Sequence, residues 1–277
     1  MARDGTPGSF LYDMAKFQQI LWGYELTLPD GWAHKTVKDA EVFAATPEAL
    51  ESSYAGERYG QLMVNAEWNC ARQTIEPIWN RHIGMVAGML GARQVGSAAW
   101  RMGGGTGFEA EIVLPKRDNK RLWAGILMRD FIVLKFAVVH LKEERKWFEP
   151  LATQIISSLR FLNRVYGVQV TKEGLPLPPG YTPIEPIQVI NDIPDPEKWR
   201  AYEGSSGVDA LQAFYLRELP IHGWAVEEYA PFPSATGLGF ARLRLDKHQQ
   251  SATLGLMPFS PDAITASSPA KIAIKYE

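Results

Sequence analysis

The chain has 277 residues, of which 46% are hydrophobic and 22% charged, and its formal net charge at pH 7 is -2. This composition can supply a real hydrophobic core, so it excludes an intrinsically disordered chain. The charge offers no global basic field for nucleic acid or an anionic membrane, and a single cysteine, Cys70, excludes an internal disulfide and a thiolate metal cluster.

The length allows one large domain or two of ordinary size, and two is the organisation we expect. Residues 1–10 (MARDGTPGSF) have no apolar signal-peptide core, and no stretch approaches 18 consecutive apolar residues. We therefore expect no membrane span and a cytoplasmic protein. Removal of a leader from the natural gene product stays an open alternative.

Alternating apolar residues predict strands early in the chain. Phe10–Ile20 forms a short amphipathic lead-in, and Tyr24–Leu28 alternates before the turn signal at residues 29–31. Gln61–Asn69 is a further strand that places four apolar residues on one face: Leu62, Val64, Ala66 and Trp68.

A helix follows, with Thr74 as its predicted N-cap and Gly91 just beyond its C-terminal end. Its inward face includes His82, which we expect a neighbouring side chain to satisfy. Val95–Met102 and Gly107–Leu114 then flank a run of glycines, a pattern that predicts a hairpin.

The most apolar stretch of the chain predicts a second hairpin. Leu122–Met128 and Phe131–His140 are rich in β-branched and aromatic residues, and we place the turn at Arg129-Asp130. The second strand is apolar on nearly both faces, so it should be central and covered on both sides. A helix with an apolar stripe follows, and Pro150 indicates that this helix begins near Glu149.

The segments Tyr24–Trp32 (YELTLPDGW) and Gln154–Phe161 (QIISSLRF, a predicted closing helix), with the helix and meander between them, resemble the PsbP-like superfamily. The resemblance covers about Leu21–Leu162 and implies an α/β/α sandwich around an antiparallel sheet. That superfamily includes photosystem accessory proteins, Ran-binding nuclear import factors and bacterial chaperones for secreted effectors. The resemblance thus implies a binding or assembly role without choosing among these.

A proline- and glycine-rich segment, Gly174–Gly180, predicts a domain boundary. We expect a PsbP-like α/β/α sandwich domain over residues 1–165 and a small α+β domain over residues 175–277. In the second domain, Gly207–Pro220 predicts one main helix, capped by Ser205 or Ser206, on an antiparallel sheet. This half resembles a module often found in bacterial proteins of unassigned role. The predicted fold class is α+β.

Motifs for catalysis or metal binding are incomplete. The five histidines form no closely spaced pair, and we expect His140 on the surface. Gly103–Gly107 lacks the lysine and the following helix of a phosphate loop. Asn191–Glu197 contains three carboxylates, but its prolines favour a solvated turn over a calcium site. We expect no catalytic residue, no metal and no cofactor.

Most of the nine tryptophans are expected in the core, because each can bury roughly 200 Å² of surface. Three lie on predicted strands, and an arginine adjoins one of them. If two of these indoles line an open groove, a peptide or an apolar ligand can dock there. The candidate ligand- or partner-binding residues are therefore Trp68, Trp100, Arg101 and Trp123.

Two classes of function remain. The first is a non-catalytic binding or assembly protein with a protein or peptide partner, such as a chaperone or adaptor that uses an aromatic-lined sheet face. The alternative is an enzyme of unknown reaction, with Glu67, His82 or Asp/Glu side chains brought together by folding in the cleft between the domains. Nucleic-acid binding needs a basic face that the charge does not suggest, so no nucleic-acid partner is expected. The oligomeric state is left open.

Overall fold

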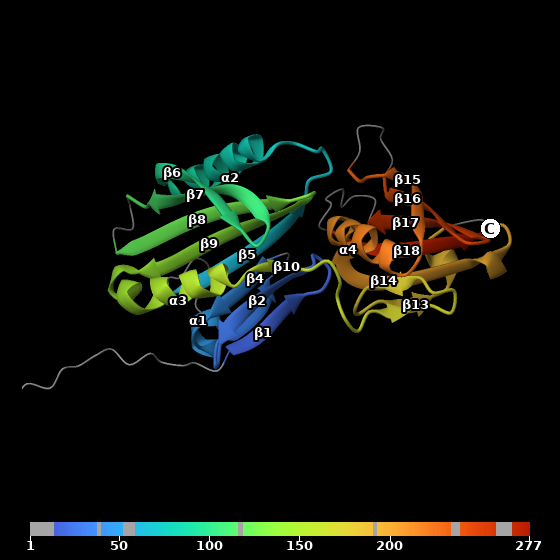
Figure 1. The fold of residues 1–277 in the computed structure, drawn as a ribbon, viewed down its shortest axis with the longest axis horizontal. Helices are drawn as coiled ribbons and strands as arrows, with labels where there is room; N and C mark the ends of the chain where they lie inside the picture. Colours follow the sequence, from blue (N-terminus) through green and yellow to red (C-terminus); the bar gives the residue numbers. More distant parts are fainter. Residues whose placement is uncertain are drawn as a thin grey trace, which may run out of the picture.

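A computed structural model describes residues 14–37, 40–51, 59–115, 119–190, 193–233, 239–258 and 268–277. Figure 1 shows two large antiparallel sheets beside one another, and we refer to residues 14–162 as the N-terminal part and to residues 168–277 as the C-terminal part. The α+β class predicted from the sequence, antiparallel sheets with helices packed on them, is confirmed. The domain boundary expected between residues 165 and 175 stays a prediction.

The N-terminal part is built on a seven-stranded antiparallel sheet. Its strands are, in spatial order, β3 (Ala33–Val37), β4 (Ala40–Ala44), β5 (Gln61–Trp68), β9 (Ile132–Leu141), β8 (Lys120–Arg129), β7 (Gly105–Val113) and β6 (Arg93–Met102). A smaller sheet and three helices complete this part: β1 (Met14–Gln19), β2 (Tyr24–Pro29), β10 (Arg160–Phe161), α1 (Pro47–Glu51), α2 (Ile75–Leu90) and α3 (Arg145–Ser157).

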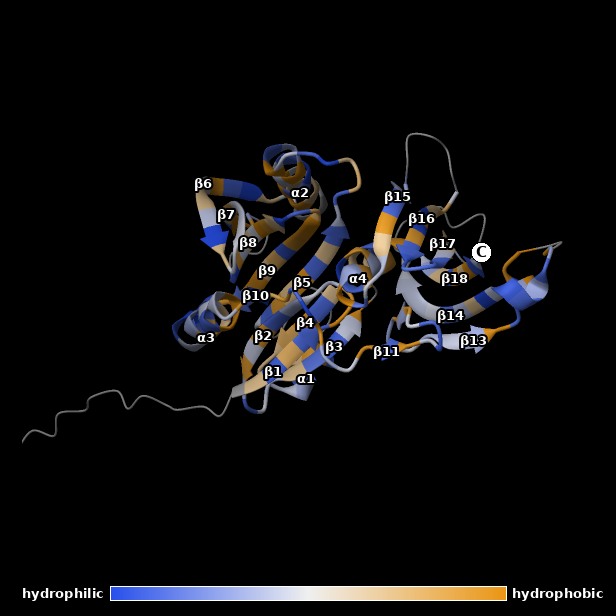
Figure 2. Cartoon of the chain, turned by 45° about the vertical axis from the view of Figure 1, so that its right-hand side comes forward, coloured by the Kyte–Doolittle hydropathy of each residue, from blue (hydrophilic) through white to orange (hydrophobic). Residues whose placement is uncertain are grey.

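Strand β9 lies between β5 and β8 and is covered on both sides, as its sequence predicts. Its even-numbered face, including Phe136, belongs to the core shared with α3 and β2, and its odd-numbered face, including Val133, packs in the core beneath α2. Figure 2 shows hydrophobic residues along most of this strand. The stacking gives three layers, with α2 on one face of the sheet and with α3 and β1–β2 on the other (Figure 1).

The turn of the central hairpin lies one residue later than expected. Arg129 pairs with Ile132, so the two turn residues are Asp130 and Phe131. Asp130 has a φ of 55°, the left-handed conformation that a two-residue hairpin turn requires and that aspartate tolerates better than most residues. The shift matters because it places the ring of Phe131 at the tip of the hairpin.

Helix α3 begins at Arg145, after a 3₁₀ turn over Lys142–Glu144, and not near Glu149 as expected. The Glu144 carboxylate accepts a hydrogen bond from the Leu141 amide (3.0 Å) and thereby supports this earlier start. Pro150 consequently lies inside the helix.

The helix also ends earlier than the predicted closing helix. Ser158 donates to the Ile155 carbonyl (2.6 Å) and accepts from the Thr27 amide (2.7 Å), a local alternative to further helical bonding. Arg160–Phe161 then pairs with β2 as a strand. The predicted amphipathic lead-in is likewise a strand, β1, paired along β2, and its residues 10–13 lie outside the described ranges.

The C-terminal part carries a six-stranded antiparallel sheet with one helix of 14 residues. The elements are, in spatial order, β13 (Thr182–Ile184), β14 (Trp199–Gly207), β18 (Pro269–Tyr276), β17 (Gln250–Pro258), β16 (Ala241–Lys247) and β15 (Ala225–Ala230), with α4 (Val208–Ile221) and a two-stranded sheet of β11 (Gln169–Val170) and β12 (Pro176–Leu177). Short 3₁₀ turns occupy Pro186–Gln188 and Pro196–Lys198.

Helix α4 is buried on two faces, one against each part of the chain, and so it connects the N-terminal and C-terminal parts. Its predicted stripe, represented by Leu211 and Phe214, lies in the core of the C-terminal sheet. The small residues Ala210 and Ala213 on another face belong to the core of the N-terminal part. Its N-cap is Gly207 and not Ser205 or Ser206, because β14 runs without a break up to the helix.

A chain of hydrogen bonds crosses the junction between the parts. The Trp68 indole N–H donates to the Tyr229 hydroxyl (3.0 Å), and this hydroxyl donates to the Gln212 side-chain oxygen (2.7 Å). The same oxygen accepts from the Phe232 amide (2.9 Å), while the Gln212 NH₂ group donates to the Phe232 carbonyl (2.8 Å). Gln212 is fully buried, so its side-chain amide depends on these partners inside the protein for its hydrogen bonds.

A second connection is made by Arg217 on α4. Its guanidinium donates to the carbonyls of Ile20 (2.6 Å) and Leu21 (3.1 Å), which lie in the β1–β2 turn, and also to Glu218 (2.7 Å). Gly23 makes room for this contact, because a side chain there would collide with Nη1 of Arg217 and its φ of 65° favours glycine.

We expect Gln212→Ala to lower the free energy of unfolding by at least about 2 kcal/mol, because it leaves the Phe232 amide and carbonyl without buried partners. Urea denaturation followed by circular dichroism measures the loss. Gln188→Ala, at an exposed position, is the matched control and should change stability by less than about 0.5 kcal/mol. Equal stability of the two variants would contradict a structural role for the buried amide.

Candidate ligand-binding site

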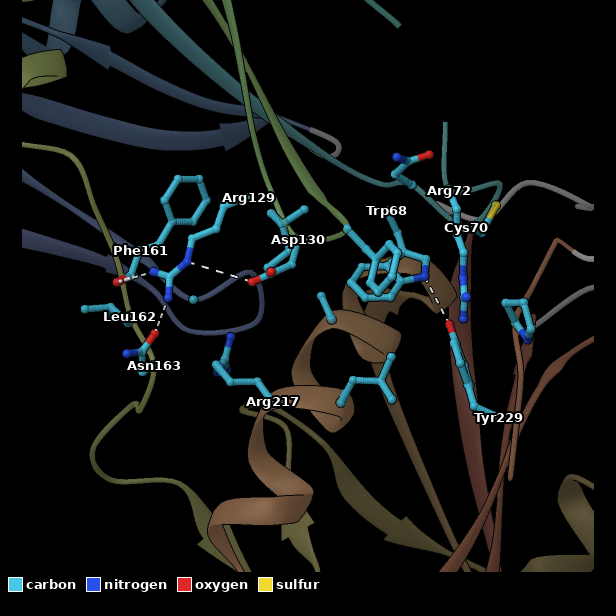
Figure 3. Close-up of a pocket in the computed structure, with 17 residues that line it drawn as sticks. Trp68, Cys70, Arg72, Arg129, Asp130, Phe161, Leu162, Asn163, Arg217 and Tyr229 are labelled. Atoms are coloured by element: carbon cyan, nitrogen blue, oxygen red, sulfur yellow. Dashed lines mark hydrogen bonds and ion pairs between the residues drawn. The ribbon is translucent and has the colours of Figure 1, made fainter. Parts of the chain in front are cut away.

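A cavity of about 450 Å³ lies where the two parts meet. Figure 3 shows that its walls come from the end of β5, the β8–β9 turn, the segment after β10, helix α4 and strand β15. Its lining residues are Gly23, Trp68, Asn69, Cys70, Arg72, Arg129, Asp130, Phe131, Ile132, Phe161, Leu162, Asn163, Ala213, Leu216, Arg217, Tyr229 and Pro231.

The inner wall is aromatic and aliphatic. The rings of Trp68 and Phe131 meet edge to face with centroids 5.6 Å apart, and Phe131 is still 36% exposed. Leu216 packs against the cores of both parts from the opposite side. The Tyr229 hydroxyl is held by Trp68 and Gln212, and burial raises its pKa, so it stays a neutral phenol.

Two of the three arginines in the cavity wall are held by the fold. Arg129 donates to the Phe161 carbonyl (3.2 Å) and to the Asn163 side chain, and its Nε lies 3.8 Å from the Asp130 carboxylate. Arg217 is bound to two backbone carbonyls and to Glu218, as described above. Both guanidinium groups therefore position backbone segments around the cavity.

Arg72 differs from these two. Its guanidinium lies over the Phe131 ring, 5.3 Å from the centroid, and within the described ranges it forms no ion pair. The loop that carries it is fixed by Asn69. The backbone N–H of Asn69 donates to the Phe131 carbonyl (2.7 Å), and its side chain donates to the Gln73 carbonyl and accepts from the Gln73 backbone N–H. Arg72 is thus an exposed cation held beside an aromatic ring at the cavity rim.

Cys70 also lines the cavity, at a turn following β5. It is half-buried, and burial raises the pKa of its thiol. The sulfur is therefore protonated near neutral pH.

The four predicted site residues do not gather in one place. Trp68 lines the inter-part cavity, whereas Trp100 and Trp123 line a separate cavity of about 270 Å³ between the sheet and α3. The two indoles are perpendicular, with centroids 5.3 Å apart, and cross above Gly125, where a side chain would collide with both. Arg101 is exposed and lines neither cavity. A binding role for these residues stays a prediction.

Sequence reasoning missed Phe131, Tyr229 and Arg72. The sequence around each of these residues contains no motif for a binding site, and the three lie close together only because the two parts of the chain are in contact. The turn signal at residues 129–131 is the one local indication of this location, and the observed turn lies one residue later than the sequence predicts.

The residues proposed for catalysis in the cleft lie elsewhere. Glu67 pairs with Lys135 and with Arg81 of α2 (3.1 Å), on the sheet face opposite the cavity. His82 was expected to have a partner, but neither ring nitrogen has one in the described part of the chain. Burial, together with the charge of Lys135, lowers the pKa of the imidazole to about 4, while the charge of Glu67 acts in the opposite direction.

His140 was expected on the surface but is buried, because it lies on the central strand β9. Its ring nitrogens contact the Leu141 carbonyl (2.7 Å) and the Glu149 carboxylate (3.0 Å). In the acidic loop, Asp195 pairs with Lys198 (3.5 Å), while Asn191 and Asp192 lie outside the described residues. Within the described residues, no three His, Cys, Asp or Glu side chains lie together in a way that could hold a metal ion.

No helix within the described ranges combines the length and apolar character needed to cross a membrane.

No protein-family profile and no curated protein matches the chain. Solved structures similar to it include cyanobacterial PsbP (CyanoP) from Synechocystis, with 16% identity over 57% of this chain and 97% of that one, at a TM-score of 0.43. LpqN of Mycobacterium tuberculosis, described as involved in cell envelope biogenesis, shares 13% identity over 55% and 92% of the two chains, at a TM-score of 0.38. Part of the chain is thus similar to a PsbP-like structure, in keeping with the resemblance read from the sequence.

We expect His82 to make the fold less stable as pH falls from 6.5 towards 4. Its pKa is lower in the folded state than in the unfolded state, so in this window the unfolded chain binds a proton that the folded chain does not. The loss amounts to up to about 3 kcal/mol. Urea titrations of wild type and His82→Phe at several pH values measure it, and the other histidines are present in both proteins. Parallel stability curves for the two proteins would contradict the lowered pKa.

Proposed function

We propose that this chain is a non-catalytic binding protein whose ligand occupies the cavity between its two parts. The observation that carries the proposal is the cavity itself, which receives aromatic side chains from both parts: Trp68 and Phe131 from one, Tyr229 from the other. Its volume of about 450 Å³ is within the range of small-molecule sites, which are mostly apolar with a few placed polar groups.

The ionisable groups of the cavity support binding better than acid–base chemistry. Arg129 and Arg217 are engaged by the fold, the Cys70 thiol has a raised pKa, and the Asp130 carboxylate points largely into solvent with 82% of its side chain exposed. The enzyme alternative relied on Glu67 or His82, and neither lines the cavity.

A chaperone or adaptor role would use this cavity in place of an open sheet face. The face that carries Trp68 and Trp123 contributes to a core that includes residues of α3, β2 and α4. An apolar segment of a partner and a free small molecule both remain compatible with such a cavity. A cytoplasmic location stays a prediction.

Filling the cavity tests the proposal. We expect Leu216→Trp to weaken binding of the neutral apolar dye Nile red at least about tenfold, because the larger indole occupies the space beside Trp68 and Phe131. Fluorescence titration measures the affinity. Met85→Trp adds the same indole at an exposed position on α2 and should leave binding unchanged. Equal dye binding by both variants, with intact thermal unfolding, would count against the cavity as the binding site.

A further inference from the structure

We propose that the cavity takes an amphipathic monoanion, a free carboxylate with an apolar tail, and that Arg72 is its counter-ion. This rests on the proposed function and adds the chemical class of the ligand. The tail would lie along Trp68, Phe131 and Leu216, and the carboxylate would sit at the rim beside Arg72.

The charges of the cavity wall favour an anion. Glu218 lies 2.7 Å from Arg217 and Asp130 lies 3.8 Å from Arg129, so each of these two cations has a carboxylate partner. Arg72 has none within the described ranges, where its side chain contacts the Phe131 ring. The uncompensated charge of the cavity is therefore positive, and it attracts an anion and repels a cationic ligand.

The position of Arg72 specifies where the anionic end lies. The guanidinium is 5.3 Å from the centroid of the Phe131 ring, and the centroids of Phe131 and Trp68 are 5.6 Å apart. The positive charge therefore lies directly beside the aromatic wall of the cavity. Burial of the exposed part of Phe131 by a hydrocarbon tail is favourable. A guanidinium with free N–H groups binds a carboxylate through two parallel hydrogen bonds.

Arg72 is one cation without a carboxylate partner among the described residues, so it matches one negative charge. A phosphate monoester carries more charge and more acceptor oxygens than Arg72 alone can satisfy, and the guanidinium groups of Arg129 and Arg217 already bond backbone carbonyls. A monocarboxylate therefore fits the available donors better than a phosphate.

Three probes with the same tail separate charge from apolar contact: decanoate, decanol and decyltrimethylammonium, each titrated calorimetrically below its micelle-forming concentration. We expect wild type to bind decanoate about tenfold more tightly than decanol, and decyltrimethylammonium most weakly. Added salt should reduce the preference for decanoate, because the rim is solvent-exposed.

Variants of Arg72 test whether this residue causes the preference for decanoate over decanol. Arg72 has a φ of 51°, so Arg72→Asn is chosen because asparagine tolerates this backbone conformation. This variant should bind decanoate about tenfold more weakly and decanol within about twofold of wild type, whereas Arg72→Lys keeps most of the preference. Arg81→Gln, which removes an exposed arginine of α2 outside the cavity, should change neither affinity.

The outcomes separate the two proposals. If decanoate binds no more tightly than decanol, or if Arg72→Asn keeps the preference, the anionic class is wrong while binding in the cavity still stands. If none of the probes binds to wild type, or if Leu216→Trp leaves their binding unchanged, the cavity is not the site and both proposals fail. Loss of decanoate binding in Arg81→Gln equal to that in Arg72→Asn would show non-specific charge attraction and would also overturn the role of Arg72.

Discussion

The Tyr229 hydroxyl joins the two parts of the chain by accepting a hydrogen bond from Trp68 and donating one to Gln212. The three hydrogen-bonded residues come from three different elements, β5, β15 and α4. Since Gln212 is fully buried, the loss of one bond would leave polar atoms without water to replace it. The junction therefore has one well-defined hydrogen-bonded arrangement and not a sliding apolar contact.

That arrangement determines where the cavity forms. The small side chains Ala210 and Ala213 let α4 approach the N-terminal part closely, and Arg217 ties the same helix to the β1–β2 turn. The rings of Phe131 and Trp68 then project from the tip of the central hairpin and the end of the neighbouring strand. The space left between them and α4 is the cavity, and Figure 3 shows its wall shared by both parts.

The arginines around the cavity divide according to their partners. Arg129 donates to the carbonyl of Phe161 at the end of β10, and Arg217 donates to two carbonyls of the β1–β2 turn, so both are part of the scaffold. Arg72 makes no comparable bond among the described residues and stays in contact with solvent and with one aromatic ring. Two of the arginines thus stabilise the junction between the parts, and the third supplies the charge that a ligand meets at the rim.

The sequence by itself determined most of the long strands and helices and which of their residues share a face, although not the exact ends of α3 or the turn between β8 and β9. Strand β5 buries the four residues predicted to share a face, β9 is central, Gly91 ends α2 in the left-handed conformation, and the stripe of α4 faces its own sheet. These features depend on periods of two or 3.6 residues within short segments, which a local pattern contains.

Only the tertiary structure decided which side chains meet. Trp68 and Tyr229 are 161 residues apart, and the apolar pattern around Trp68 is the same whether its N–H reaches a tyrosine or a solvent-filled groove. For the same reason, His82 and His140 were expected in the wrong environments, and Trp100 and Trp123 turned out to line a different cavity from Trp68. Local periodicity specifies a face, but the partner on that face is selected by packing between distant segments, which no short stretch of sequence encodes.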